Sequence, residues 1–245
     1  MKKDTLETKI NILAIILARG GSKGIPKKNI QKLMGRPLLA YTVDAAKQAK
    51  QIDHIVLSTD DIEIANIAKS EGVEIIMRPS EFATDTAPMH QALCHAVQEV
   101  EKKEGKIQVV VSLFANIPLR KEGVIDEAIT KLIETSADSI KTYYLCNKPP
   151  QWAVKIENDS PELLHKEYAY AYRRQLLPPT YYPDGSVIVV KRDVLMRSIQ
   201  SSDPYAFLGT NKIALVSNYE DTVDVDTPID LLWAEFLMKK KKFMV

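Results

Sequence analysis

Cysteine is scarce in this 245-residue sequence, and so are the long apolar runs that mark membrane proteins. The two cysteines, Cys94 and Cys146, are far apart and match no CxxC pattern, which excludes a disulfide framework or a cysteine-rich zinc site. No apolar run approaches the roughly 18 residues of a membrane span. The opening letters MKKDTLETKI are too polar for a secretory signal. We therefore expect a cytoplasmic protein that does not enter a membrane.

An excess of charge of one sign is also missing. Lysine and arginine total 33 against 32 aspartates and glutamates, a formal net charge of +1. Such a balance provides no general field for nucleic acid or an anionic membrane, so we expect neither as a partner. Any positive potential must be local. With 45% hydrophobic residues the chain can bury a large core, and we expect one domain over residues 1–245.

Short β-branched runs alternate with helical patterns along the chain. This alternation is typical of βαβ units and predicts an α/β fold with a mainly parallel sheet. Strands are expected at residues 11–18, 54–59, 73–77, 107–113, 138–145, 186–191 and 212–217. Helices are expected from Pro37, between Asp60 and Gly72, over about 88–104, through 124–133 and after a cap at Thr227.

Residues 147–184 break this alternation. The segment is rich in proline, tyrosine and charge, has two Pro-Pro pairs and shows no helical period. Long loops in compact domains are usually functional. We therefore expect an insertion that serves as a lid, a dimerisation arm or both, the alternative being a long solvated loop.

The stretch ILAIILARGGSKGIPKKN, residues 12–29, joins an apolar strand to a glycine-rich, basic loop. Parallel sheets bind ligands at the carboxyl ends of their strands. We expect Gly20, Gly21 and Gly24 to adopt positive φ and to bring backbone N–H groups toward phosphate oxygens. Basic and hydroxyl side chains add charge-assisted donors; they are Arg19, Ser22, Lys23, Lys27 and Lys28. The loop therefore predicts a triphosphate site, although it matches neither the P-loop nor the dinucleotide fingerprint.

A pair of acidic residues lies near the C-terminus, in TVDVDTPIDL. Asp224 and Asp226 alternate on an extended segment, so both side chains are expected to point the same way. Adjacent carboxylates repel unless a cation lies between them, and oxygen ligands suit Mg²⁺. The pair predicts a magnesium site, the alternative being a cap on the last helix.

Taken in order, the motifs ILARGGSKGIPKKN, RPSEFATDTAP, PLR, RRQLLPP, YPDGSVIVV and VDVDTPIDLLWAE resemble the acylneuraminate cytidylyltransferases, or CMP-sialic acid synthetases. The likeness extends from about Ile12 to Glu235. It implies a Rossmann-like nucleotidyltransferase fold with helices on both faces of the sheet, and a homodimer whose arm reaches the partner's active site. The implied reaction joins CTP and an acidic keto-sugar to give a CMP-sugar and pyrophosphate.

The resemblance also implies a role for individual residues. Arg19, Lys23 and Asp226 would be catalytic, and Asp224 with Asp226 would bind Mg²⁺. Arg78 and Ala87 would lie by the base, and Asn29 by the ribose. The full nucleotide site would comprise Ala18, Arg19, Gly20, Gly21, Ser22, Lys23, Lys28, Asn29, Arg78 and Ala87. The sugar site would comprise Phe114, Asn116, Arg120 and, from the arm facing the neighbouring subunit, Arg174 and Gln175.

This chain departs from the family pattern on the sugar side. The family usually reads LQPTSPLR where this chain has LFANIPLR, with Phe114, Ala115, Asn116 and Ile117 expected to line the sugar pocket. Ile188 replaces a common tyrosine there, and Met89 replaces a serine or threonine near the base. A binding site that lacks hydrogen-bond partners for a polar ligand binds that ligand more weakly. We therefore expect an acceptor with fewer or relocated polar groups than N-acetylneuraminate.

Three other functions remain open at this stage. The chain could couple a nucleotide to a sugar phosphate or phosphonate, since the nucleotide motifs match better than the sugar motifs. It could be a glycosyltransferase, because such folds also place an Asp-x-Asp pair on a metal ion beneath a nucleotide sugar. It could be a non-catalytic nucleotide sensor. The strongly basic loop argues against the second alternative, and the intact acidic pair argues against the third.

Overall fold

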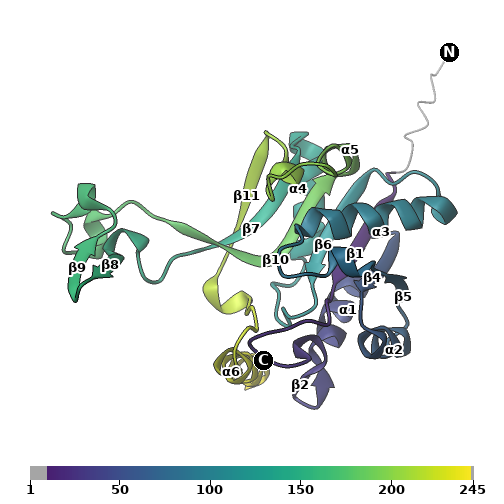
Figure 1. The fold of residues 1–245 in the computed structure, drawn as a ribbon, viewed down its shortest axis with the longest axis horizontal. Helices are drawn as coiled ribbons and strands as arrows, with labels where there is room; N and C mark the ends of the chain where they lie inside the picture. The colour runs from purple at the N-terminus through teal and green to yellow at the C-terminus, as the bar shows by residue number, and fades with distance from the viewer. Residues whose placement is uncertain (1–9, 244–245) are drawn as a thin grey trace.

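In residues 10–243, the part of the chain that the computed structural model describes, seven strands form one mainly parallel sheet (Figure 1). The strands are β1 (Ile12–Leu17), β4 (His54–Thr59), β5 (Glu74–Met77), β6 (Val109–Phe114), β7 (Ser139–Leu145), β10 (Tyr181–Lys191) and β11 (Lys212–Ser217). Their order is β11-β7-β10-β6-β1-β4-β5. Only β10 runs antiparallel to its neighbours β6 and β7. All seven strands expected from the sequence are confirmed, and the sheet is mainly parallel as predicted.

The central strand β1 is buried on both faces, which explains its uninterrupted apolar sequence. Alternate side chains, beginning with Ile12, face the helices α1 (Leu38–Gln48), α2 (Ile62–Ser70) and α4 (Val124–Thr135). The others, beginning with Leu13, face α3 (Met89–Glu104) and α5 (Arg192–Arg197). Each fully buried Leu or Ile contributes about 1.5–3 kcal/mol to folding. The helices therefore cover both faces of the sheet.

Helix ends follow the capping signals closely. The carboxylate of Asp61 accepts the N–H groups of Glu63 and Ile64, so the N-cap of α2 lies one residue after Asp60, where the helix was expected to begin. The last helix, α6 (Pro228–Phe243), follows Thr227 as predicted, and Asp230 accepts hydrogen bonds from the Thr227 N–H and hydroxyl. In residues 10–243, no helix is both long and apolar enough to cross a membrane.

Four loops meet at the carboxyl edge of the sheet. The register sets Leu17 of β1 opposite Ser58 of β4 and Phe114 of β6, so these strands end together. The segment that precedes α6 joins the same edge through a bridge between Leu119 and Val223. A small hairpin, β2 (Lys32–Leu33) and β3 (Arg36–Pro37), follows the loop after β1. The fold thus brings the glycine loop and the acidic pair to one edge.

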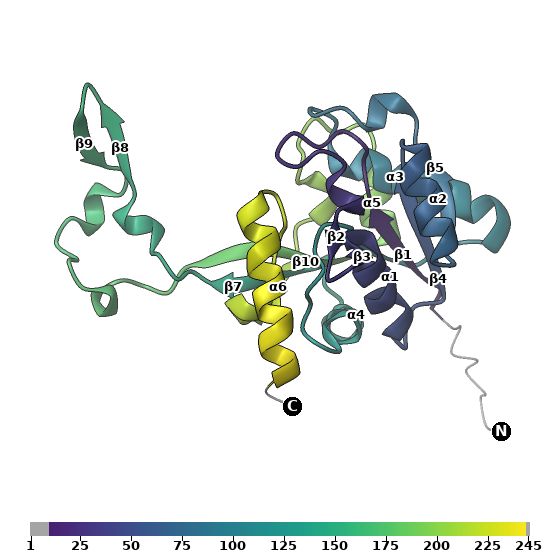
Figure 2. The same ribbon diagram turned by 90° about the horizontal axis from the view of Figure 1, so that it is seen from below.

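The 147–184 segment forms an arm. The end of β7 and the start of β10 pair beyond the sheet, with Tyr182 opposite Tyr144, and carry residues 146–180 away from the body of the molecule (Figures 1 and 2). The arm contains a hairpin, β8 (Val154–Glu157) and β9 (Ser160–Leu163), which the sequence analysis did not predict. The expectation of a protruding insertion is confirmed.

Candidate functional site

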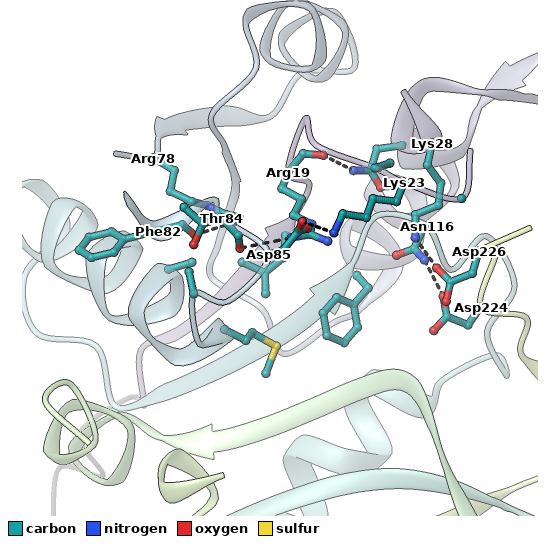
Figure 3. A pocket seen from close by; sticks show the side chains of 18 of the residues that line it. Arg19, Lys23, Lys28, Arg78, Phe82, Thr84, Asp85, Asn116, Asp224 and Asp226 are labelled. Carbon is teal, nitrogen blue, oxygen red and sulfur yellow. Dashed lines mark hydrogen bonds and ion pairs between the residues drawn. The ribbon is translucent and has the colours of Figure 1, made fainter. Parts of the chain in front are cut away.

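A cavity of about 680 Å³ opens at the carboxyl edge of the sheet (Figure 3). Segments far apart in sequence line it: the loop after β1, the segment between β5 and α3, the loop after β6, and the acidic pair. The lining residues are Leu17, Arg19, Ser22, Lys23, Gly24, Lys28, Asn29, Arg78, Phe82, Thr84, Asp85, Ala87, Met89, Ala92, Phe114, Asn116, Asp224, Asp226 and Thr227. The two patterns singled out in the sequence therefore share one cavity.

The loop after β1 is anchored by backbone and side-chain hydrogen bonds. The N–H of Ala18 donates to the Ser58 carbonyl at 3.1 Å, and the N–H of Gly20 donates to the Asp60 carboxylate at 2.9 Å. The buried Asn29 amide donates to the Arg19 carbonyl at 2.9 Å. Ala18, Gly20 and Gly21 are not among the residues that line the cavity. Their part is to hold the loop from which Arg19, Ser22 and Lys23 reach it.

The prediction that the three glycines of this loop adopt positive φ is wrong. None of Gly20, Gly21 and Gly24 has positive φ; in this loop the left-handed conformation is taken by Lys27, at φ 52°. Close packing explains two of them instead. A Cβ on Gly24 would lie 2.3 Å from the Asp226 carbonyl oxygen, and one on Gly20 would lie 2.8 Å from the Asp61 Cβ. The glycine at position 24 thus lets the loop touch the acidic segment.

The basic side chains of the loop do not all reach the cavity. Lys27 pairs with Glu63 outside it, whereas Lys28 pairs with Asp226. Arg19 lies 3.0 Å and Lys23 2.6 Å from opposite oxygens of Asp85. The hydrogen bond from Lys23 holds the pKa of the Asp85 carboxyl below its ordinary value. Three cations of this loop, Arg19, Lys23 and Lys28, therefore line the cavity.

Arg78 closes the far end of the cavity. It is buried, and its guanidinium donates to the Ser58 hydroxyl at 3.1 Å and the Ser58 carbonyl at 2.8 Å. Burial lowers its pKa to about 10, so the side chain is still charged at neutral pH. Ala87 and Met89 line the same cavity. The residues expected near the base are brought together.

The acidic pair lies at the opposite end from Arg78. The amide Nδ2 of Asn116 donates to a carboxylate oxygen of Asp224 and to the Val225 carbonyl at 3.2 Å. Burial first, and then the charge of Asp226, raise the pKa of Asp224 to about 6. The nearby charge of Lys28 and the hydrogen bond from Asn116 lower this pKa, but they do not offset the first two effects. Lys28 bonds to Asp226 and leaves Asp224 with an amide only.

This donor set fits a divalent cation. Two carboxylates repel each other within one cavity, and the basic loop provides space for phosphate oxygens beside them. Within residues 10–243, no cluster of three or more histidine, cysteine, aspartate or glutamate side chains has the geometry of a metal site. Two protein carboxylates could hold a divalent cation whose remaining ligands are waters or phosphate oxygens.

The loop after β6 only partly matches its expected role. Phe114 and Asn116 line the cavity, but Ala115 and Ile117 are fully buried behind it, which corrects their placement in the sugar pocket. Ile188 is likewise a core residue, packed in the cluster on the α3 face of the sheet. Asn116 holds Asp224 rather than pointing freely into the cavity. Phe114 is left as the main apolar surface here.

Arg120 does not line the cavity, contrary to its expected contact with substrate. Its guanidinium donates to the carbonyls of Ser186 at 2.9 Å and Phe114 at 2.9 Å, and to the Thr42 hydroxyl at 2.9 Å. Burial lowers its pKa to about 9. These bonds tie the loop after β6 to β10 and α1. Arg120 therefore positions the loop that carries Asn116.

The two arm residues are remote from the cavity of their own chain. Arg174 and Gln175 lie in a short 3₁₀ helix (Arg174–Leu176) of the arm, and Arg174 donates to the Cys146 carbonyl at 3.0 Å. Neither lines the cavity. A role in catalysis would therefore require a neighbouring subunit.

Sequence reasoning missed several cavity residues. Phe82, Thr84 and Asp85 lie between β5 and α3, in the motif RPSEFATDTAP. The sequence analysis assigned no role to Asp85. Gly185 has φ 66°, and a Cβ there would lie 2.9 Å from Ile117 Cδ1, 3.6 Å from Phe114 and 3.9 Å from Asp224. The Asp-Gly pair in YPDG was the available signal for this glycine. Gly185 does not line the cavity, but a side chain there would crowd Ile117 and approach Phe114 and Asp224.

Comparisons with known proteins agree with this geometry. Residues 13–227 match the family model described as "Cytidylyltransferase". The chain is 31% identical over 232 residues to the "post-translational flagellin modification protein B" of Campylobacter coli, covering 94% of this chain and 96% of that protein. It is 30% identical to an N-acylneuraminate cytidylyltransferase of Streptococcus agalactiae, covering 90% of this chain but only 51% of that relative.

A solved structure shares the fold. The structure described as CMP:2-keto-3-deoxy-manno-octonic acid synthetase complexed with CTP superposes with a TM-score of 0.72 and 18% identity. The match covers 94% of this chain and 99% of that one. At this identity the likeness concerns the fold, which is the α/β nucleotidyltransferase fold expected from the sequence.

Proposed function

Because this chain belongs to the cytidylyltransferase family and is a nucleotidyltransferase, we propose that it transfers CMP from CTP to the anomeric hydroxyl of an acidic keto-sugar. The observation that carries the proposal is a single cavity lined by three cations, Arg19, Lys23 and Lys28, and by the acidic pair, which Lys28 contacts through Asp226. The relative named N-acylneuraminate cytidylyltransferase supports the substrate class. Family membership favours this reaction over the sensor and glycosyltransferase alternatives.

The chemistry needs positioning and charge neutralisation more than a protein nucleophile. The anomeric oxygen attacks the α-phosphorus and releases its proton to solvent, the bond from that phosphorus to the bridging oxygen breaks, and pyrophosphate leaves with that oxygen. We assign Arg19, Lys23 and Lys28, with the Ser22 hydroxyl, to the triphosphate. Asn29 would lie by the ribose, and Arg78, Ala87 and Met89 by the cytosine.

Enzymes of this family generally use a divalent metal ion. We propose Mg²⁺, held by Asp224 and Asp226, because their oxygen ligands and mutual repulsion suit a hard cation. The cation would supply positive charge beside the phosphates when bound. Asn116 keeps the Asp224 carboxylate oriented for this role.

The acceptor should differ from N-acetylneuraminate. Phe114 gives the acceptor end of the cavity an apolar wall, and the amide of Asn116 is already bonded to Asp224. A sugar with fewer or relocated polar groups suits such a surface. A phosphorylated acceptor remains the second candidate, since the nucleotide side of the site matches the family better than the acceptor side.

We also propose that the chain is one domain with an arm that joins two copies into a homodimer. The arm exposes aromatic side chains of the types enriched at interfaces; they include Trp152, Tyr170, Tyr172, Tyr181 and Tyr182. Arg174 and Gln175 would then face the neighbouring active site. A nucleoside triphosphate is a cytoplasmic metabolite, so the cytoplasmic location expected from the sequence remains part of the proposal.

Pyrophosphate release tests the proposed function. The full chain would be assayed with each of the four common ribonucleoside triphosphates against a panel of acidic keto-sugars, sugar phosphates and phosphonates, with and without Mg²⁺. We expect pyrophosphate release only with CTP, Mg²⁺ and an acidic keto-sugar together. We also expect N-acetylneuraminate not to be the best acceptor. Faster release with a sugar phosphate would favour the second candidate. N-acetylneuraminate as the best acceptor would show that LFANIPLR was interpreted wrongly.

A further inference from the structure

Asp85 lies between Arg19 and Lys23, two of the cations that line the cavity. Its two carboxylate oxygens lie 3.0 Å from Arg19 NH1 and 2.6 Å from Lys23 Nζ (Figure 3). Arg19 also donates to the carbonyl of the preceding residue, Thr84, at 3.3 Å. All of these residues line the cavity. Two of the side chains assigned to the triphosphate, Arg19 and Lys23, are therefore already bound to an anion from their own chain.

We infer that Asp85 is a placeholder for the triphosphate, a carboxylate that positions Arg19 and Lys23 before the nucleotide binds and is displaced when it does. The inference rests on the proposed function only in taking these two side chains as phosphate ligands. One carboxylate that bridges two long, flexible cations holds both near the place where phosphate oxygens are needed. Without it, Lys23, whose side chain is 83% exposed, would have no partner to order it.

Electrostatic repulsion from the triphosphate would displace the Asp85 carboxylate. A triphosphate brings several negative charges to Arg19 and Lys23, and a carboxylate left between them would repel it. The pairs are exposed at the cavity mouth, where ion pairs contribute little to stability, so the carboxylate can leave at small cost. It can also return when pyrophosphate leaves. Asp85 therefore weakens the binding of triphosphate and pyrophosphate alike.

The segment that carries Asp85 also lines the end of the cavity near Arg78, so replacement of Asp85 by the triphosphate can affect that end. Residues 79–88 also carry Phe82, whose carbonyl accepts from Arg78 at 3.5 Å, and Ala87. Movement of Asp85 away from the loop after β1 shifts a segment that lines the proposed base site. Cytidine, which has no phosphate, would not provoke the exchange.

Binding measurements on the full chain test the placeholder. Asp85→Asn removes the charge and keeps the shape, and Glu81→Gln is the matched control, because Glu81 is an exposed acid of the same segment outside the cavity. Calorimetry would use CTP, inorganic tripolyphosphate and cytidine as probes. We expect Asp85→Asn to bind CTP and tripolyphosphate about 1.5- to fivefold tighter, the range of exposed ion pairs, with cytidine unchanged. Glu81→Gln should change none of the three.

Kinetic measurements distinguish competition between Asp85 and phosphate from a general structural effect of the substitution. Asp85→Asn should lower KM for CTP and the inhibition constant of pyrophosphate by the same factor while kcat stays at the wild-type value or falls through slower product release. Asp85→Glu should restore wild-type affinity. In an Arg19→Ala/Lys23→Ala background, Asp85→Asn should have no effect. Weaker or unchanged CTP binding by Asp85→Asn, with wild-type binding intact, would overturn the inference. A wild-type chain that does not bind CTP would instead contradict the proposed function.

Discussion

Among single residues, Asp224 has the most perturbed carboxyl group of the described cavity. It is buried beside a second carboxylate, and its hydrogen bond from Asn116 does not offset these two effects, so its pKa rises to about 6. A raised pKa means that the folded chain binds this proton more tightly than the unfolded chain. Without a metal ion, folding stability from this group is therefore lost as pH rises from about 4 toward 6.

The substitution Asp224→Asn tests this electrostatic strain. In the presence of a chelator it should raise the melting temperature at pH 7.5 and change it little at pH 4, where the wild-type carboxyl is already protonated. A gain of about 1 kcal/mol corresponds to about 2–4 °C for a chain of this size. Added Mg²⁺ should stabilise the wild type and not the variant. Thermal unfolding at both pH values checks this, and destabilisation at pH 7.5 would contradict it.

Residue types were easier to predict than residue roles. The basic side chains and the acidic pair were found because their chemistry is unusual beside a buried strand. Arg120 was misplaced because an arginine in a motif gives no indication of whether its donors meet a ligand or, as here, four backbone or hydroxyl acceptors of the fold. Asp85 was missed because its partners lie more than 60 residues away in sequence.

At the scale of elements, the loop after β1 and the segment before α6 form one unit. Gly24 touches the backbone of Asp226, and Lys28 pairs with the carboxylate of the same residue. Ile25 of the loop packs in a small core with Val223, Val225 and Leu237 of α6. The phosphate loop and the metal carboxylates are therefore held in a fixed relation by direct packing.

Gly24→Ala should disturb both halves of the site at once. Its Cβ would lie 2.3 Å from a backbone oxygen, so loop and acidic segment must separate. We expect triphosphate and Mg²⁺ binding to weaken together, each by at least about tenfold, while the far-ultraviolet circular dichroism is unchanged. Gly21→Ala is the control, because nothing lies within 4 Å of its Cβ position and its φ is not positive. Equal effects of the two substitutions would contradict the packing role.

Elements with a clear hydrophobic period were predictable, and those without one were not. The seven sheet strands contain short apolar runs, fully or nearly fully buried in β1 and β6 and only partly buried in β5 and β11, which is why their positions could be predicted. The hairpin of β8 and β9 was missed because most of its side chains are exposed, so no alternation appears. Its turn, Asn158 and Asp159 at φ 50° and 63°, was the only local signal. Helix α5 has six residues, too few to show a period.

For the whole molecule, the arm is the feature that a single chain does not explain. Figures 1 and 2 show it projecting from the sheet, and it exposes 66% of Tyr170 and 76% of Tyr172. Exposed aromatic residues on a projecting segment are typical of an interface. The sequence predicted the arm from composition, but its contacts with a second subunit remain a proposal.

Mixing two inactive variants tests the arm. Arg174→Ala removes the residue that we assign to the neighbouring site, and Asp226→Asn removes a metal ligand of the chain's own site. Each variant should be nearly inactive alone. A mixture exchanged through mild denaturation should regain a measurable fraction of turnover, because a mixed dimer has one complete site. Pyrophosphate release checks this; a fully active Arg174→Ala chain, or a monomer in sedimentation, would contradict the role across the interface.

The most direct test of the account follows one oxygen atom. The acceptor with the highest turnover would be labelled with ¹⁸O at its anomeric hydroxyl and incubated with CTP, Mg²⁺ and the full chain, and the products would be analysed by mass spectrometry. Attack of the anomeric oxygen on the α-phosphorus predicts a CMP-sugar that keeps the label and unlabelled pyrophosphate. An unlabelled CMP-sugar, or products without a CMP-sugar, would contradict cytidylyl transfer as the function of this site.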